Sequence, residues 1–276
     1  MNSDKCLKRN SIIWWQKILL LLFTIHYSLF TFSQVGSWQN HLAYSEVQNI
    51  CEAGNDLFVL ASNDLYQYNQ NDQSITTYDK VNGLSDINIT HIAWNSQAKR
   101  LIIVYQNSNI DLLDVKGNVT NISALYSKTM TEDKSVSKIT IDGIYAWLHC
   151  GFGYVKVNMQ AVEISDTYME NHPDYSTSLP DYDEYKDLAT YSSIVSSLSP
   201  GGPKYNYFYE SKFLNHKLYT TGGYFLSGMP DLLHPGTIQV YHDNEWTIFE
   251  DELEKKTGYR YVDINCIDID PTDEKA

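Results

Sequence analysis

A repeated pattern of strands limits the fold of this chain more than any other feature of its sequence. In residues 100–114, RLIIVYQNSNIDLLD, two apolar runs flank a polar insert at 106–109. This pattern predicts a strand, a tight turn and a second strand. Its alternating residues should pack against a neighbouring sheet on either side. Similar units begin at Val47, Ile89, Val136, Tyr207 and Val262.

The spacing of the units predicts the architecture. The second strands of the first three units begin at Leu57, Leu101 and Ile144, which are 44 and 43 residues apart. A period of about 40–45 residues, with several short strands in each unit, is typical of a β-propeller blade. The 22 Tyr and six Trp of the chain also favour strands. We therefore expect an all-β fold, a β-propeller of four-stranded blades that is incomplete or truncated.

The period breaks after the third unit, because Ile144 and Leu218 lie 74 residues apart. The extra chain, at about 169–203, is rich in Ser, Pro, Tyr and acidic residues. We expect a loop insertion here with a short helix near Tyr182–Tyr191. The alternative is a degenerate or missing blade. Long loops in compact domains are often functional.

The two ends of the chain predict export and truncation. A basic head and an apolar run at 18–32 are typical of a signal peptide, so residues 1–33 should be removed before Gln34. An uncleaved N-terminal anchor is the alternative. Residues 34–276 would be propeller blades, and because the fifth unit breaks off, they would be the N-terminal part of a longer protein. Alternatively, residues 36–44 form a closing strand that completes the fifth blade.

The charge of the chain indicates which partners are disfavoured, and its cysteine content indicates whether disulfides form. A net charge of −14 disfavours nucleic acid, whose phosphates require a basic surface. Cys51, Cys150 and Cys266 remain after the leader, an odd and widely spaced set. We expect buried free thiols. One disulfide with one leftover thiol is the alternative.

No motif in the sequence predicts catalysis, a metal site or a cofactor. His149 and Cys150 are adjacent on an expected strand, so their side chains point to opposite faces and cannot pair as base and nucleophile. Four acidic residues near the C-terminus lack the glycine and closing glutamate of a calcium loop, and fit local turns better; they are Asp263, Asp268, Asp270 and Asp273. The acidic residues of 181–187 fit a solvated surface better than a catalytic pair.

Tyrosines are the candidate ligand-binding residues. Four of them are spread through the expected insertion: Tyr175, Tyr182, Tyr185 and Tyr191. Exposed tyrosine rings can bind sugars or proteins. The alternative is that they pack the insertion against the propeller.

Several short motifs, in this order, carry a resemblance to a known family. They are WQNHLAY (38–44), NGLSD (82–86), NSNIDLLD (107–114), GFGYVKVN (151–158), EISDTY (163–168), SLSPGGPKYNYFY (197–209), PGTIQVY (235–241) with Trp246, and DIDPTD (268–273). The chain resembles the N-terminal propeller of the PorZ family, a surface component of the type IX secretion system. The resemblance covers nearly all of residues 36–273.

The resemblance implies a role in assembly at the cell surface. Members of this family consist of two propellers and a terminal β-sandwich, and they pass through the periplasm to the outer-membrane surface. There they join a sortase-like protease, a shuttle protein and a further partner in a complex that attaches cargo to anionic lipopolysaccharide. The family member is expected to bind this glycolipid and is not the protease. The second propeller and the sandwich lie outside this sequence.

The alternative function is that of a periplasmic sensor propeller in a hybrid two-component regulator for polysaccharide use. In such sensors the NGLSD-like turn recurs after many blades, whereas it occurs once here.

Overall fold

The computed structural model describes residues 39–170, 179–223, 225–226, 229–230, 236–250 and 252–273. The chain separates into two units, Met1–Gln39 and Asn40–Ala276. The expected signal peptide and its apolar run lie outside the described residues. None of the described helices has the length and apolar character needed to cross a bilayer.

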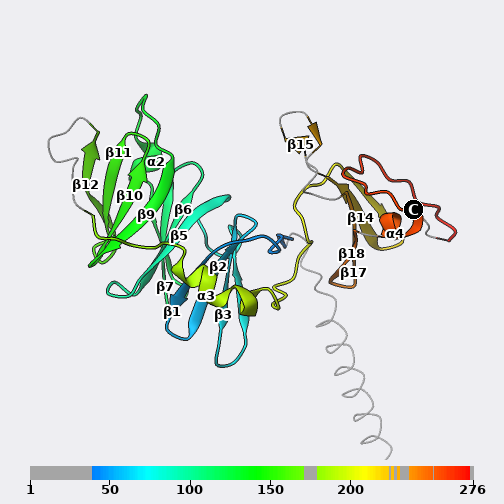
Figure 1. The fold of residues 1–276 in the computed structure, drawn as a ribbon, viewed down its shortest axis with the longest axis horizontal. Helices are drawn as coiled ribbons and strands as arrows, with labels where there is room; N and C mark the ends of the chain where they lie inside the picture. Colours follow the sequence, from blue (N-terminus) through cyan, green and yellow to red (C-terminus); the bar gives the residue numbers. More distant parts are fainter. Residues whose placement is uncertain are drawn as a thin grey trace, which may run out of the picture. The chain divides into compact units, whose positions relative to one another are not determined.

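Three antiparallel four-stranded sheets follow one another along the chain, and we call them blades 1, 2 and 3 (Figure 1). Blade 1 consists of β1 (Val47–Ala53), β2 (Asp56–Ala61), β3 (Asp64–Asn69) and β4 (Ile75–Tyr78). Blade 2 consists of β5 (Ile89–Asn95), β6 (Arg100–Tyr105), β7 (Ile110–Asp114) and β8 (Val119–Ile122). Blade 3 consists of β9 (Val136–Asp142), β10 (Tyr145–Cys150), β11 (Gly153–Asn158) and β12 (Glu163–Met169). Their first strands begin where the repeat predicts, and the all-β prediction is confirmed.

One hydrogen bond recurs in the three blades and shows that they repeat the same structure. The residue after the second strand donates its backbone N–H to the carbonyl of the residue before the first strand. The pairs are Ser62 and Glu46 (2.8 Å), Gln106 and Asn88 (2.9 Å), and Gly151 and Ser135 (3.1 Å). The repeat found in the sequence is therefore also a repeat of backbone register.

The core lies between neighbouring blades. Leu101 and Ile103 of β6 pack in a cluster with Phe58 of blade 1. Ile102 and Val104, which alternate with them, pack in a cluster with blade 3. All four side chains are fully buried. The prediction that residues 100–114 form a hairpin packed on both faces is confirmed.

A fourth antiparallel sheet corresponds to the unit predicted at Tyr207. It consists of β13 (Glu210–Leu214), β14 (Lys217–Gly222), β17 (Thr237–His242) and β18 (Glu245–Phe249), in that order. A two-stranded hairpin, β15 (Phe225–Leu226) and β16 (Met229–Pro230), interrupts it between β14 and β17.

The prediction that a strand opens a fifth unit at Val262 is wrong, because residues 259–270 form no strand. Ile267 and Ile269 instead pack on Tyr219 of the fourth sheet. The Glu210 carboxylate accepts the N–H of Ile267 at 2.8 Å. This stretch therefore binds the sheet through a side chain and not through the backbone hydrogen bonds that join neighbouring strands. Residues 39–45 form no strand either, so the alternative of a closing strand finds no support in the described part of 36–44.

Three helices complete the described chain: α2 (Ala124–Ser127), α3 (Lys186–Val195) and α4 (Glu252–Thr257). The helix α3 begins and ends four residues later than the helix expected at 182–191. It packs on blade 1 (Figure 1), where Val195 joins a buried cluster with Ile50 and Val59. This is the face of blade 1 turned away from blade 2.

Candidate functional site

The predicted ligand-binding tyrosines have different surroundings. Tyr175 lies outside the described residues. Tyr191, on α3, packs against the cluster on blade 1, and Tyr182 is half-buried. Tyr185 is 47% exposed and presents the most open ring of the three. Ligand binding by these tyrosines remains a prediction.

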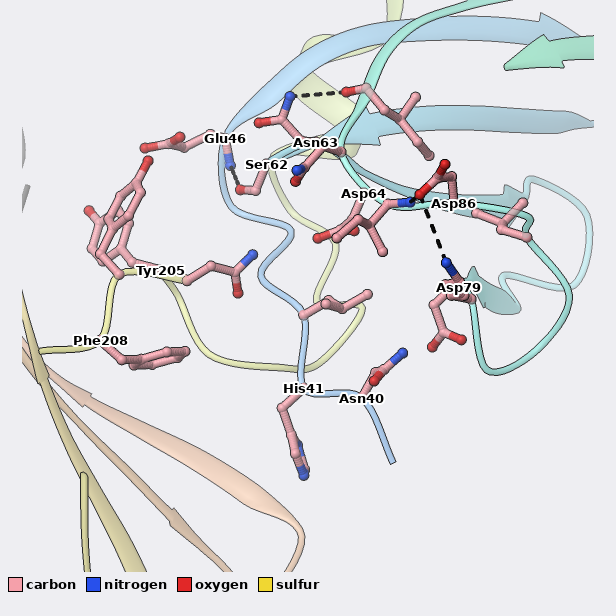
Figure 2. Close-up of a pocket in the computed structure, with 18 residues that line it drawn as sticks. Asn40, His41, Glu46, Ser62, Asn63, Asp64, Asp79, Asp86, Tyr205 and Phe208 are labelled. Atoms are coloured by element: carbon pink, nitrogen blue, oxygen red, sulfur yellow. Dashed lines mark hydrogen bonds and ion pairs between the residues drawn. The ribbon is translucent and has the colours of Figure 1, made fainter. Parts of the chain in front are cut away.

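A pocket of about 470 Å³ lies at one end of blades 1 and 2 (Figure 2). Four stretches line it, within residues 40–46, 62–64, 79–89 and 205–208. They include the β2–β3 turn and the connection from β4 to β5, which lie at the same end of a blade because successive strands are antiparallel. Connections carried on a rigid scaffold are the usual place for binding residues.

Side-chain hydrogen bonds shape the connection at 79–84. The Asp79 carboxylate accepts the backbone N–H of Val81 (2.7 Å) and of Asn82 (2.9 Å). The Asn82 amide donates to the carbonyl of Thr77 at 2.8 Å, and the N–H of Leu84 donates to the Asp79 carbonyl at 2.9 Å. Short polar side chains of this kind stabilise turns by bonding to nearby backbone. The wall of the pocket is thus built locally from its own sequence.

Asn63 joins blade 1 to blade 2 beside the pocket. Its side-chain amide donates to the carbonyl of Ile89 (3.0 Å), and its own carbonyl accepts the N–H of Ile89 (2.9 Å). Asn63 has a φ of +66°, a left-handed conformation that asparagine adopts more easily than most residues. The position therefore favours asparagine for its conformation and for its hydrogen bonds.

A buried carboxylate anchors the NGLSD motif from behind. Asp111 of β7 is fully buried, and its Oδ2 accepts both the N–H of Ser85 (2.8 Å) and the hydroxyl of Tyr105 (2.6 Å). The Asn121 amide donates to Oδ1 at 2.8 Å. Burial and the Asp111 carboxylate both raise the pKa of Tyr105, so its hydroxyl stays a donor. Sequence reasoning missed this network; the acidic residue inside the apolar run of β7 was its only signal.

The pocket is acidic. Glu46, Asp64, Asp79 and Asp86 line it together with one lysine, Lys80. Burial raises the pKa of Asp64 to about 7; a hydrogen bond from Asn206 opposes this shift, and nearby Asp79 adds to it. Such a lining repels anionic groups and attracts cations.

Asp86 is held in its charged form within this lining. Burial alone would raise its pKa, but hydrogen bonds from Asn107 and from the Ile87 N–H, with Lys80 nearby, lower it. The Lys80 Nζ lies 3.9 Å from Asp86 Oδ1.

Aromatic rings form another wall (Figure 2). Tyr205 stacks with Tyr207 at 6.2 Å between ring centroids, and both line the pocket together with His41 and Phe208. The Asn206 side chain accepts the N–H of Ala43 at 3.0 Å, which fixes the stretch at 205–208 against the stretch at 40–46. Rings beside carboxylates can bind cationic side chains or groups that donate several hydrogen bonds.

The residues considered as candidates for catalysis or metal binding do not lie together in one site. His149 Nε2 lies 2.9 Å from the Thr140 hydroxyl, whereas the Cys150 thiol points to the Leu148 carbonyl at 3.8 Å. Asp268 pairs with Lys212 at 2.9 Å, and Asp270 accepts the N–H of Thr272 at 2.8 Å. Within the described ranges, no three His, Cys, Asp or Glu side chains gather as a metal site would require.

All three cysteines outside the leader are free thiols. Cys51 is buried, as predicted, and burial raises its pKa. Cys150 is half-buried, with a pKa raised by burial to about 12. Cys266 is exposed, so the prediction of burial is wrong for it. It lies in the stretch at 259–270 that forms no strand.

The profile of the PorZ N-terminal β-propeller domain of the type IX secretion system matches residues 57–198. The chain belongs to this family. The match begins in β2 of blade 1, contains blades 2 and 3 and α3, and includes one wall of the pocket. No curated protein matches the sequence.

A solved structure shares the fold of this chain. PorZ of Porphyromonas gingivalis, an essential surface component of the type IX secretion system, is 18% identical with a TM-score of 0.64. The alignment covers 80% of this chain and 47% of PorZ, so the chain spans about half the length of that protein. At this identity the likeness shows the fold.

Two other similar structures are more distant. The extracellular domain of the hybrid two-component system BT4673 of Bacteroides thetaiotaomicron is 13% identical, with a TM-score of 0.38, and the alignment covers 74% of this chain and 22% of that one. AztD of Citrobacter koseri is 12% identical, with a TM-score of 0.37 and coverage of 73% and 45%.

Proposed function

We propose that this chain is a non-catalytic binding and assembly module of the type IX attachment complex at the cell surface. The observation that carries the proposal is the family match over residues 57–198, which covers most of blade 1 and all of blades 2 and 3. The rigid interblade core supports it, because such a core holds the connecting loops in fixed positions for a partner. An export signal at 1–33 would bring the chain to the periplasm and outer membrane.

The partners in this proposal are the sortase-like protease and the shuttle protein of the complex. The pocket at blades 1 and 2 is the best candidate for contact with one of them. Its four carboxylates favour a basic segment of the partner, and its aromatic wall provides apolar contact area. Electrostatic complementarity of this kind raises association rates and selects partners.

We place the proposed contact with anionic lipopolysaccharide elsewhere. Glu46, Asp64, Asp79 and Asp86 would repel its phosphate or acidic sugar groups from the pocket. The exposed ring of Tyr185 can instead stack on a sugar. Tyr126, which is 50% exposed on α2, provides a matched control for this residue.

Binding of the purified full chain to the purified shuttle protein and protease tests the proposal. At pH 8, above the pKa of Asp64, the wild-type chain should bind at least one of them, and Asp64→Asn should weaken that binding about tenfold, which corresponds to about 1.4 kcal/mol. Asp72→Asn, in the exposed β3–β4 turn at the other end of blade 1, is the control and should bind like wild type. Equal binding by both variants would exclude the pocket, and no binding to either protein would exclude the assembly role.

Lipopolysaccharide vesicles test the glycolipid contact separately. Tyr185→Ala should reduce binding to vesicles, while Tyr126→Ala and Asp64→Asn should leave it unchanged. Loss of binding in Asp64→Asn, or unchanged binding in Tyr185→Ala, would refute this placement.

A further inference from the structure

Residues 182–198 contact the first strands of blades 1 and 3, which we call the inner strands, and we call this segment the strap. The Glu184 Oε2 accepts the backbone N–H of Ile139, on β9 of blade 3, at 3.1 Å. The Asp187 Oδ2 accepts the backbone N–H of Glu52, on β1 of blade 1, at 2.7 Å. Two carboxylates of one short segment thus bind free N–H groups of first strands from blades 1 and 3.

The helix that follows fixes the strap to blade 1. Val195 is buried in the cluster with Ile50 and Val59, and Leu188 packs against the same cluster. The Tyr191 hydroxyl hydrogen-bonds to the Glu52 side chain. The helical part of the strap is therefore held on blade 1 by apolar packing and by Asp187, whereas the beginning of the strap is held on blade 3 by Glu184.

Burial of the Glu184 carboxylate costs more free energy than the other contacts of the strap. The residue is 5% exposed, and its second oxygen, Oε1, is buried without a hydrogen-bond partner. An ionised carboxylate with an unsatisfied buried oxygen is unfavourable, and a neutral carboxyl in the same place costs much less. The carbonyl oxygen of a neutral carboxyl still accepts the Ile139 N–H.

The groups around Glu184 do not compensate for its burial. The Ile139 N–H and the cation Lys138 of β9 both favour its charged form, but burial outweighs them, so the pKa of Glu184 is raised to about 7. Cys51 faces it from β1. The strap itself contributes Tyr182, Asp183, Tyr185 and Asp187.

We propose that the strap is a pH-sensitive clasp, closed over the inner edges of blades 1 and 3 when Glu184 is protonated and loosened when it ionises. Loosening frees the N–H group of Ile139, a strand-edge donor of the kind that an incoming extended segment can bind. The clasp is a property of blades 1 to 3 and goes beyond the proposed role in assembly.

The direction of the pH dependence follows from the link between proton binding and closure of the strap. A carboxyl with a folded pKa above its unfolded value binds more protons in the closed state, so closure weakens as the pH rises through the folded pKa. With a pKa of about 7 when closed and 4.5 when open, closure should weaken about tenfold between pH 6 and pH 8.

Residue-resolved hydrogen exchange on the full chain tests the clasp. The protection factor of the Ile139 amide, corrected for the intrinsic pH dependence of exchange, should fall about tenfold from pH 6 to pH 8. Amides of the interior strand β10 provide an internal reference and should not change. In Glu184→Gln, which keeps an acceptor oxygen but cannot ionise, the protection factor of Ile139 should be independent of pH.

Asp183→Asn is the matched control, because Asp183 is an exposed carboxylate of the same segment. This variant should keep the wild-type pH dependence. A flat wild-type profile at Ile139, or an equal fall in wild type and Glu184→Gln, would overturn the proposal. A flat profile would be seen in the wild-type protein itself, so this part of the test does not depend on whether a variant folds.

Discussion

Removal of the Tyr105 hydroxyl should destabilise the chain measurably. This hydroxyl donates to Asp111 Oδ2 at 2.6 Å inside a fully buried network. The same oxygen accepts the N–H of Ser85, so the network joins β6, β7 and the NGLSD connection. Tyr105→Phe deletes one donor and leaves the shape of the side chain nearly unchanged.

The expected loss of stability depends on the group that accepts the hydrogen bond. A hydrogen bond to a charged group contributes about 1.5–3 kcal/mol. Asp111 keeps the donors Ser85 and Asn121, so we expect a loss of about 2 kcal/mol in the free energy of unfolding. For a domain of this size, that loss lowers Tm by about 4–8 °C.

Urea unfolding followed by intrinsic fluorescence measures this loss, with Tyr78→Phe as the control. The Tyr78 hydroxyl donates to the uncharged Gln67 amide oxygen at 2.6 Å in a half-buried site, so its loss should cost about 1 kcal/mol. A destabilisation below about 0.5 kcal/mol in Tyr105→Phe, or one smaller than in Tyr78→Phe, would refute the assignment of Asp111 as a structural anchor.

Three further predictions follow from burial and charge. Leu148→Ala, in the fully buried cluster between blades 2 and 3, should lower the free energy of unfolding by about 2–5 kcal/mol in the same urea assay, and a loss below 1 kcal/mol would contradict a packed interblade core. The pKa of Asp64 is raised to about 7 from 3.8, so its contribution to stability should decline as the pH rises from 5 to 8 and should be absent in Asp64→Asn; parallel pH profiles of the two proteins would contradict this. Iodoacetamide should modify exposed Cys266 in the native protein and buried Cys51 only after unfolding, and mass spectrometry showing equal rates would contradict the assigned burial.

The sequence predicted the elements that depend on local pattern. Blades 1 to 3 begin at Val47, Ile89 and Val136 because alternating apolar residues and polar turns recur at a fixed spacing. The hairpin at 100–114 could be assigned to the middle of a blade because both of its faces are apolar. Local pattern failed at Val262, where an alternating stretch packs against a sheet through side chains without joining its ladder. Alternation indicates which residues face a core, but it does not show that a partner edge is available.

The candidate site was mostly beyond sequence reasoning. The pocket joins Asn40 and His41 to Tyr205 and Phe208, which are more than 150 residues away in the chain. The roles of Asp111 and Glu184 depend on burial, which composition does not show. The acidic stretch at 181–187 seemed typical of a solvated surface, yet two of its carboxylates bind inner-strand N–H groups.

The central claim is that the chain acts in type IX attachment at the cell surface, and surface-bound cargo after deletion of its gene tests it most directly. The account predicts that cells without the gene lose type IX cargo from their surface, and that the full-length gene restores it. Unchanged cargo attachment in the deletion strain would contradict the account.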